Sequence, residues 1–271
     1  MKLMKTPRYV APGMYLLALS IVAFFHSSAH TTVRAATQET KPVLVELFTS
    51  EGCSSCPPAD ALLARLDATQ FVAGARAIVL SEHVTYWDRQ GWRDPFSLDG
   101  MTRRQNEYGR KFNLDDVYTP QVVVDGSAQF VGSDERQLRA RIAKATDAPK
   151  VGLQIVEIQA VPGSVQFKVQ LASGATAPRS HLIAALAEDA VQSSVSRGEN
   201  AGRTLKHVAV VRDMQDFGEK ALAGQTLTLK LPGSTAKEDA RSQHPLRIVV
   251  FLSETQTGRV LGIDEHTVSL P

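Results

Sequence analysis

The first half of the chain alternates between short apolar runs and a segment with helical periodicity. Residues 43–48 and 77–80 are rich in strand formers, and the second run is continuously apolar, as a buried parallel strand would be. Between them, residues 60–69 place leucines at helical spacing. This pattern predicts a strand, a helix and a second strand, in that order.

Four further elements are predicted after a polar loop: a helix at 97–112, a strand at 121–124, a return strand at 127–131 and a helix from 134 to about 144. Asp125-Gly126 is a strong hairpin signal between the two strands. Asp134 is a favourable N-cap for the last helix, with Gln137 three residues later.

The pattern changes after Pro149, which ends the helical periodicity. Residues 151–161 and 165–171 alternate around Pro162-Gly163, a hairpin signature. Further strand-like runs lie between Gly, Ser and Asp clusters, at 181–187, 206–211, 225–231, 246–252 and 260–263. Short strands at this spacing predict a mainly antiparallel β-sandwich-like domain. We place the boundary near residue 149, between residues 42–148 and residues 150–271.

Residues 1–36 have the pattern of a secretory signal peptide. Three basic side chains precede an apolar stretch at residues 10–25, and Ala29, Ala35 and Ala36 offer alternative cleavage sites. The alternative is a membrane anchor, but this stretch is interrupted by Pro-Gly and is shorter than the roughly 20 residues that a spanning helix needs. We predict a periplasmic or secreted protein with no membrane span after cleavage.

The net charge of the predicted mature chain argues against one class of partner. The full sequence carries +2, and loss of the four basic residues in 1–36, which contain no acid, changes the charge to −2. No basic stripe remains, so nucleic acid is not an expected partner. The oligomeric state is left open.

The two cysteines carry the clearest chemical signal. Cys53 and Cys56 are the only cysteines in the chain, and they stand at Cys-x-x-Cys spacing between the first strand and the first helix. At the amino end of a helix, unpaired N–H groups and the helix dipole favour a thiolate, the reactive form of cysteine. This predicts a redox-active pair. An inert disulfide is the alternative, although so short a loop contributes little stabilisation.

Four segments resemble a known protein family: VELFTSEGCSSCPPAD, EHVTYWDRQGWRDPFS, YTPQVVVDG and RGENAGRTLKHVAVVR. The family consists of exported bacterial proteins and is catalogued as domain of unknown function 1223, with a thioredoxin-like fold. The resemblance extends from about Pro42 to the end of the chain. It implies an α/β thioredoxin-like domain, followed here by the β-rich domain.

The thioredoxin-like resemblance implies roles for residues around the cysteines. Cys53 would be the more exposed nucleophile and Cys56 the resolving thiol. Pro120 would be a cis-proline facing them, with Thr119 beside a bound substrate segment; an ordinary trans proline is the alternative. Glu46 resembles the buried acid of thioredoxins, displaced by one residue, and would take a proton from Cys56. Alternatively, Glu46 reaches solvent at the sheet edge.

Neighbouring polar residues would set the reduction potential of the pair. The hydroxyls of Ser54 and Ser55 would donate to the Cys53 sulfur, whereas Glu51 would oppose thiolate formation if it points inward. The sequence leaves the balance open, and with it the choice between oxidase and reductase.

A loop at residues 81–95 contains His83 and both tryptophans, Trp87 and Trp92. Ligand crevices of open α/β sheets form beyond the carboxyl ends of strands, where this loop lies, so these residues are candidates for substrate binding. The alternative is that the tryptophans pack the loop and the histidine is merely hydrogen-bonded. Two thiolates and one imidazole also make a plausible copper set, with Cys53 and Cys56 as the other ligands.

A polar loop at residues 197–203, RGENAGR, precedes the strand with His207. It would dock on the first domain, bind a ligand or form a salt-bridged turn, and we favour the turn.

Three functions follow from these observations. The leading hypothesis is a thiol–disulfide oxidoreductase that acts on exported proteins or small thiols and needs no cofactor. The alternatives are a copper- or other metal-binding protein and a non-catalytic binding module with a structural disulfide.

Overall fold

The computed structural model describes residues 40–232 and 245–268. The predicted signal peptide lies outside these residues. In the described part of the chain, seven of the helices and strands precede the predicted boundary: β1 (Lys41–Thr49), α1 (Pro57–Thr69), β2 (Ala75–His83), α2 (Asp99–Lys111), β3 (Gln121–Val124), β4 (Ala128–Val131) and α3 (Glu135–Ala145).

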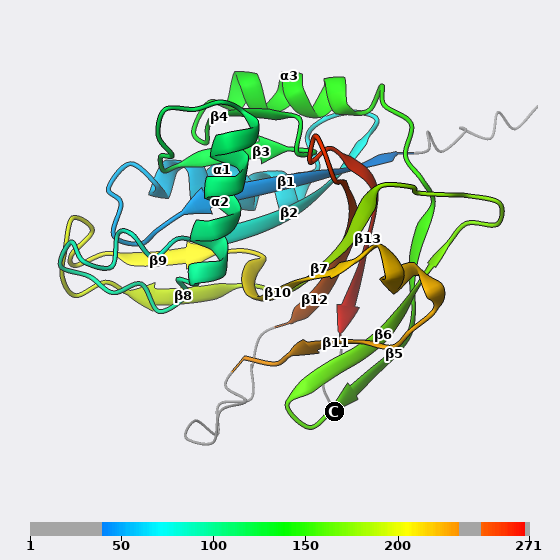
Figure 1. Ribbon diagram of the computed structural model, residues 1–271. Helices are drawn as coiled ribbons and strands as arrows, with labels where there is room; N and C mark the ends of the chain where they lie inside the picture. The colour runs from blue at the N-terminus through cyan, green and yellow to red at the C-terminus, as the bar shows by residue number, and fades with distance from the viewer. Residues whose placement is uncertain (1–39, 233–244, 269–271) are drawn as a thin grey trace, which may run out of the picture. The chain divides into compact units, whose positions relative to one another are not determined.

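The elements after residue 149 are almost all strands (Figure 1). They are β5 (Leu153–Val161), β6 (Ser164–Leu171), β7 (Ser180–Glu188), β8 (Val191–Ser194), β9 (Thr204–His207), β10 (Val210–Gly218), the 3-10 helix η1 (Glu219–Ala223), β11 (Leu227–Lys230), β12 (Leu246–Glu254) and β13 (Val260–Val268).

One large mixed sheet dominates the described residues. Its eight strands follow the order β13-β12-β7-β10-β2-β1-β3-β4. β1 and β2 are parallel, whereas β3 and β4 are antiparallel to their neighbours. β10 joins β2 at Val210 and Ser81, so strands from both sides of residue 149 belong to the same sheet. The architecture is therefore a mixed α/β fold with a large sheet and few helices.

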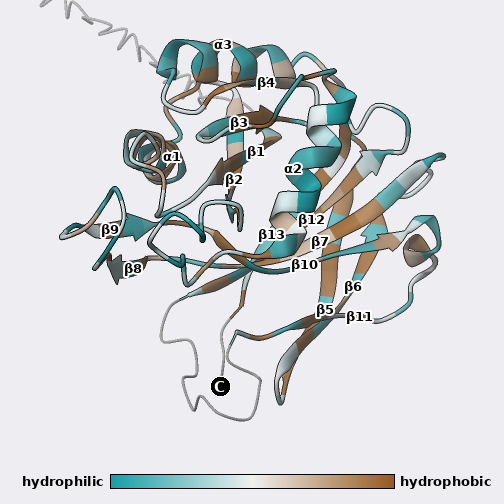
Figure 2. Ribbon diagram, turned by 60° about the vertical axis from the view of Figure 1, so that its left-hand side comes forward, coloured by the Kyte–Doolittle hydropathy of each residue, from teal (hydrophilic) through white to brown (hydrophobic). Residues whose placement is uncertain are grey.

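Two smaller sheets complete the strands. β11, β6 and β5 form an antiparallel sheet, and β8 pairs with β9 as a separate hairpin. The three-stranded sheet packs on the large sheet through an apolar cluster that includes Phe167 of β6, Leu186 of β7 and Val250 of β12. Figure 2 shows the hydrophobic colouring concentrated along these strands, whereas α2 is largely hydrophilic.

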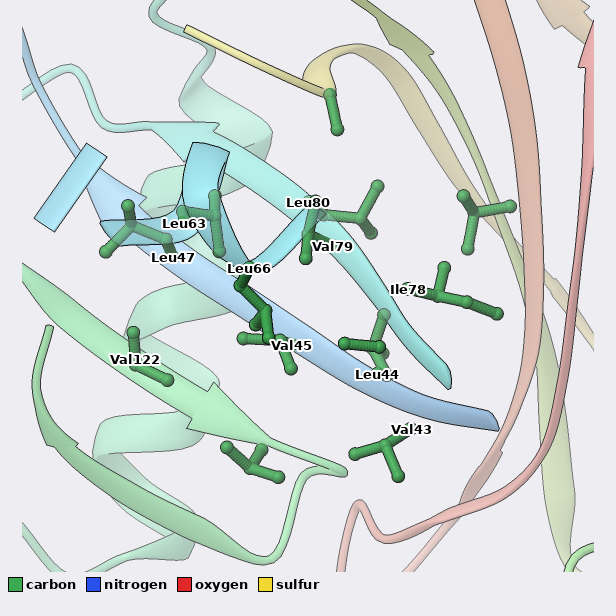
Figure 3. Close-up of a cluster of buried hydrophobic side chains, with 14 of the residues drawn as sticks. Val43, Leu44, Val45, Leu47, Leu63, Leu66, Ile78, Val79, Leu80 and Val122 are labelled. Atoms are coloured by element: carbon green, nitrogen blue, oxygen red, sulfur yellow. The ribbon is translucent and has the colours of Figure 1, made fainter. Parts of the chain in front are cut away.

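β1 is buried along most of its length and is mostly apolar, as expected for a strand that is covered on both faces (Figure 3). Leu47 and Ala59 of α1 both border Gly132, so the Leu47 side chain lies on the α1 side of the strand. The next residue, Phe48, makes an edge-to-face contact with Tyr108 of α2. Successive strand residues point to opposite faces, so α1 and α2 lie on opposite sides of β1. The chain then leaves β1 into the turn that carries the cysteines.

Local signals account for several boundaries. The side chain of Asp134 accepts a hydrogen bond from the backbone N–H of Gln137, which confirms the predicted N-cap of α3. Asp125 and Gly126 both have positive φ in the turn between β3 and β4, as the hairpin signal indicated. Pro57 begins α1, where the missing N–H costs no helical hydrogen bond.

Three predicted elements are wrong in extent. The strand predicted at 260–263 continues to Val268 as β13, because it pairs with β12 as far as Leu246. β2 continues to His83, because Ser81 and Glu82 remain paired with β1, so His83 ends a strand instead of lying in the loop. The predicted strand at 206–211 is divided between β9 and β10, because Ala209 adopts a left-handed conformation (φ 47°) that breaks the extended chain.

Candidate functional site

The site is centred on a disulfide between Cys53 and Cys56. Cys56 is the N-cap of α1, and the backbone N–H of Cys56 donates to the Cys53 carbonyl (3.2 Å). The Ser55 hydroxyl lies 3.3 Å from the Cys53 sulfur, as expected for one of the two intervening serines. The pair therefore occupies the predicted position between β1 and α1.

Both cysteines are 0% exposed, so the expectation that Cys53 is the more exposed of the two is wrong. The physical reason is that surrounding segments cover the turn from two sides. One cover is the loop after β2, and the other is the β8–β9 hairpin with its connecting loop.

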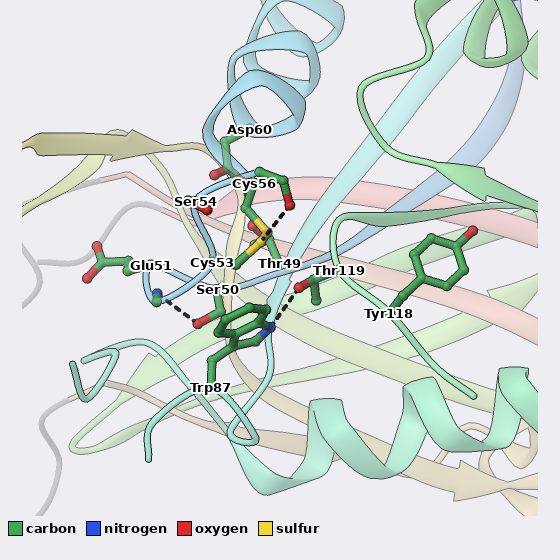
Figure 4. Close-up of a disulfide and its surroundings, with 12 residues drawn as sticks. Thr49, Ser50, Glu51, Cys53, Ser54, Cys56, Asp60, Trp87, Tyr118 and Thr119 are labelled. Atoms are coloured by element: carbon green, nitrogen blue, oxygen red, sulfur yellow. Dashed lines mark hydrogen bonds between the residues drawn. A yellow bond between two sulfur atoms is a disulfide. The ribbon is translucent and has the colours of Figure 1, made fainter. Parts of the chain in front are cut away.

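Trp87 provides the first cover (Figure 4). A Cβ on Gly52 would lie 3.2 Å from the Trp87 Cβ, so the tryptophan packs directly on the turn. The indole N–H of Trp87 donates to the Thr119 hydroxyl (2.7 Å), and the Thr119–Pro120 bond is cis. Two predicted substrate-binding residues, Trp87 and Thr119, are thus brought together beside the disulfide.

The β8–β9 connection provides the second cover. The Asn200 side-chain amide donates to the carbonyls of Glu51 and Cys53, both at 2.9 Å, and Asn200 is completely buried. The backbone N–H of Ser54 donates to the Glu199 carboxylate (3.0 Å), and these Ser54 hydrogen bonds lower the pKa of Glu199. The loop at 197–203 therefore docks on the cysteine turn, in place of the salt-bridged turn that we favoured.

Glu51 points away from the disulfide, toward β8 and β9 (Figure 4). Its carboxylate accepts hydrogen bonds from the Trp92 indole (2.8 Å) and from the Ser193 hydroxyl, and it lies 3.3 Å from His207 Nε2. Trp92 accordingly holds Glu51 and packs against Gly198 of the covering loop. Glu51 therefore does not point inward toward the sulfurs, which is the orientation in which we expected it to oppose thiolate formation.

A buried pair of His83 and Asp94 lies behind the turn. Their side chains are 2.7 Å apart, and Asp94 also accepts a hydrogen bond from the backbone N–H of Glu51 (2.9 Å). Burial alone would lower the pKa of His83, but Asp94, together with the charges of Asp60 and Glu51, outweighs burial and raises it. For Asp94, burial raises the pKa, but His83 and the N–H groups of Glu51 and Phe96 outweigh it and lower it to about 2. This pair anchors the loop that carries Trp87.

Asp60 and His207 complete the buried polar cluster. Asp60 of α1 accepts a hydrogen bond from the Thr49 hydroxyl (2.9 Å), and its other oxygen lies 3.9 Å from His207 Nδ1. Burial raises the pKa of Asp60, although His207, His83 and Thr49 oppose that shift. The ring of His207 is also 4.7 Å from that of His83, in an edge-to-face arrangement.

Glu46 does not have the predicted place beside Cys56. Its carboxylate accepts hydrogen bonds from Arg104 Nε (2.5 Å) and Tyr108 (2.6 Å) on the α2 side of β1. Burial raises the pKa of the neighbouring Glu82 well above its ordinary value, and the Glu46 charge adds to this, while Arg104 opposes it. Strand alternation explains the difference. Successive side chains point to opposite faces of a strand, and Leu47 faces α1, so its neighbour Glu46 must face away from α1.

The proposed metal set is also not assembled. His83 is bonded to Asp94, and the two cysteines are bonded to each other. Within residues 40–232 and 245–268, no group of three or more His, Cys, Asp or Glu side chains is arranged to hold a metal ion.

Sequence reasoning missed Asp60 as a site residue. It noted Asn200 only within a polar loop with docking or ligand binding as alternatives to a turn, and His207 only in the strand that follows. Asp60 follows Cys56 by four residues, which is one helical turn and was a usable signal. His207 and Asn200 lie within the RGENAGRTLKHVAVVR segment that carried the family resemblance, but nothing in one sequence shows which distant turn they contact.

The comparisons with known proteins agree with this description. A solved structure of a protein from Agrobacterium tumefaciens aligns with a TM-score of 0.59 at 24% sequence identity, covering 85% of this chain and 95% of that one. At this identity the similarity supports the fold. A domain of the outer membrane lipoprotein Omp28 from Porphyromonas gingivalis aligns at 19% identity over 44% of this chain and 95% of its own, but its TM-score of 0.25 carries no argument.

No curated protein matches the sequence. None of the helices within the described residues is long and apolar enough to cross a bilayer. The family model for proteins of unknown function DUF1223 matches residues 44–252. Because this match covers most of the chain, the protein belongs to the DUF1223 family.

Proposed function

We propose that this protein is an exported thiol–disulfide oxidoreductase that acts through Cys53 and Cys56. The observation that carries the proposal is the disulfide at the amino end of α1, bordered by Trp87 and by the Thr119–Pro120 bond. The helix terminus stabilises a thiolate, which is the species that takes part in disulfide exchange.

The arrangement of residues 41–145 supports a thioredoxin-like unit. Along the chain these residues form a strand, a helix, a strand, a helix, two strands and a helix, which is the element order that carried the resemblance. In the sheet the strands follow the order β2-β1-β3-β4, with β1 and β2 parallel and β3 and β4 antiparallel to their neighbours. The cysteines follow β1 and precede α1, and Pro120 begins the segment that enters β3. The export signal expected in residues 1–36 would deliver the chain to an oxidising compartment, where disulfides persist.

The exchange reaction needs only the two cysteines and a partner disulfide. In the reducing direction, the Cys53 thiolate attacks the partner disulfide and releases one partner thiolate, leaving a mixed disulfide. The Cys56 thiolate then attacks Cys53, which releases the second partner thiol and regenerates the protein disulfide. The reverse sequence oxidises a partner dithiol. Trp87 and Thr119 are the residues that we expect a partner segment to contact.

A second function is favoured by one observation: neither cysteine is exposed. A covered disulfide suits a non-catalytic binding module in which the bridge only shapes the turn. Under this alternative, the β8–β9 hairpin is a permanent part of the structure and partner binding does not depend on the sulfurs.

The reduction potential of the Cys53–Cys56 pair separates the two functions. The full chain is equilibrated in glutathione redox buffers, free thiols are alkylated, and the intact mass is measured at each step. A potential between about −120 and −270 mV is the range of dithiol enzymes and is the result we expect. A value below about −300 mV is typical of structural bridges and would overturn the proposal. The Cys53→Ser variant must also lose activity in a disulfide-exchange assay.

A further inference from the structure

The buried cluster behind the cysteines contains an acid that the exchange chemistry can use. Cys56 has helical backbone angles (φ −77°, ψ −38°), and Asp60 follows it by four residues in α1. Residues four apart in a helix have neighbouring side chains, about 5–6 Å between Cβ atoms. Figure 4 shows Asp60 next to Cys56. Asp60 is 6% exposed, so its carboxyl group is largely removed from solvent.

Two neighbours face the Asp60 carboxyl group, and one of them holds it in place. Thr49 of β1 donates a hydrogen bond to Oδ1. His207 of β9 directs Nδ1 toward Oδ2 at 3.9 Å, and this nitrogen has no hydrogen-bond partner within the described residues. A separation of 3.9 Å is longer than a hydrogen bond, so Oδ2 is not committed to the histidine. One carboxyl oxygen is thus fixed and the other is available.

Other acids near the turn are already occupied. Asp94 is paired with His83, Glu51 is bonded to Trp92 and points away from the sulfurs, and Glu46 lies on the α2 side of the sheet. This leaves Asp60 as the acid available to Cys56. The charged groups that act on Asp60 are His207 of β9, His83 of β2 and Asp94 in the loop after β2.

We propose that Asp60, held by Thr49 and facing His207, exchanges a proton with the Cys56 thiol during disulfide exchange. The inference rests on the proposed function and deepens it. It also gives the β-rich half of the chain a role, because His207 reaches the site from β9.

The proton balance of the step is complete. In the mixed disulfide, the Cys56 thiol transfers its proton to the Asp60 carboxylate, and the resulting thiolate attacks the Cys53 sulfur. The Cys53–Cys56 bond forms, and the bond between Cys53 and the partner sulfur breaks. The departing partner thiolate takes a proton, which Asp60 supplies through solvent at the opened site. The two electrons pass from the protein dithiol to the partner disulfide.

Burial supports this use of Asp60. A carboxyl group that is easier to protonate than one in water is a better match for a thiol, because proton transfer is most efficient between groups of similar pKa. Burial raises the pKa of Asp60 in that direction, and the positive charge of a protonated His207 opposes it.

The test uses the reduced full chain and the aromatic disulfide 5,5′-dithiobis(2-nitrobenzoate). Each molecule of protein releases two coloured thiolates, the first on attack by Cys53 and the second on resolution by Cys56. A Cys56→Ser variant, which lacks the resolving thiol, identifies the first phase. The rates of both phases are followed by stopped-flow absorbance over a range of pH in Asp60→Asn, His207→Gln and the control Asp115→Asn, at an exposed position.

In Asp60→Asn we expect the second phase to slow about 100-fold, the lower end of general acid–base effects, and the first phase to be unchanged. Asparagine still offers Thr49 an oxygen, so the local structure is retained. In His207→Gln we expect the pH profile of the second phase to move to higher pH, because a group that lowers the pKa of Asp60 is lost. Asp115→Asn should match wild type.

Two results would overturn the inference while leaving the proposed function intact. One is a second phase in Asp60→Asn within about two-fold of wild type, and the other is equal slowing of both phases, which would indicate a structural role. Absence of coloured product with wild-type protein would instead refute the exchange function itself, and the inference with it.

Discussion

At the scale of single residues, the site combines groups that stabilise the fold with groups that cost stability. His83 and Asp94 form a compact buried pair, and each shifts the pKa of the other toward the charged state. Asp60 is shifted in the opposite direction, because burial disfavours its charge. Both effects appear in the pH dependence of stability, with opposite signs.

The His83–Asp94 pair should stabilise the protein most between about pH 4 and pH 6.5. The pKa of Asp94 is lowered to about 2, so its contribution is present above its unfolded value near 3.9 and is lost as the pH falls toward 2. The pKa of His83 is raised, so the charged histidine contributes below about 6.5 and is lost as the pH rises through its folded value. Asp94→Asn should cost about 2 kcal/mol near pH 6 and much less near pH 2, measured by urea unfolding. An equal cost at both pH values would contradict this.

Asp60→Asn should have the opposite effect on stability. A carboxyl group with a raised folded pKa destabilises the protein once the pH exceeds its unfolded value, and the penalty is complete above the folded pKa. The variant should therefore be more stable than wild type at neutral pH, and the gain should vanish below about pH 4. Chemical denaturation at the two pH values tests this, with Asp115→Asn, at an exposed position, as the control. A variant that is less stable at neutral pH would refute the sign.

At the scale of elements, the β8–β9 hairpin is the feature that distinguishes this site from an open dithiol. The Asn200 amide donates hydrogen bonds to two carbonyls of the cysteine turn, and the Glu199 carboxylate accepts one from the N–H of Ser54. Hydrogen-bonding groups of the turn that would face a partner are therefore paired within the chain. Access to the sulfurs requires at least a local displacement of this hairpin or of the Trp87 loop.

Removing the Asn200 side chain should open the site. Asn200→Ala loses two buried hydrogen bonds and removes the donor to the Glu51 carbonyl, while the Cys53 carbonyl keeps the N–H of Cys56; this should cost about 1–3 kcal/mol of stability. The same change should accelerate reduction of the Cys53–Cys56 disulfide by dithiothreitol, measured by alkylation and mass. Arg197→Ala, an exposed position on the same loop, serves as the control. Unchanged reduction kinetics in Asn200→Ala would show that another segment limits access.

At the scale of the whole described chain, ion pairs connect the two parts that the sequence divides at residue 149. Arg247 of β12 makes a bidentate pair with Asp67 of α1 and a second pair with Asp189. Lys150 bonds to Asp125, and Arg76 bonds to Glu265. Together with the pairing of β10 and β2, these contacts make the large sheet a single structural unit.

The chain should therefore unfold in one transition. Fluorescence reports on residues 81–95, because both tryptophans lie there, and segment-resolved hydrogen exchange reports on β12. We expect the two probes to give the same midpoint in denaturant, and Arg247→Ala to lower both together, by about 3 kcal/mol or more, because two partly buried carboxylates lose their partner. Separate midpoints would indicate independent domains.

The sequence by itself determined the local elements and the position of the chemistry. Apolar runs, helical periodicity and turn signals depend on neighbouring residues, so β1, α1, β3 and the N-cap at Asp134 could be predicted, as could the Cys-x-x-Cys pair at a helix terminus. The tertiary structure alone decided which face of β1 Glu46 occupies, that Asn200 covers the turn, and that His207 reaches Asp60. Those contacts join residues far apart in the sequence, whose meeting depends on sheet order and on a hairpin more than 130 residues beyond the cysteines.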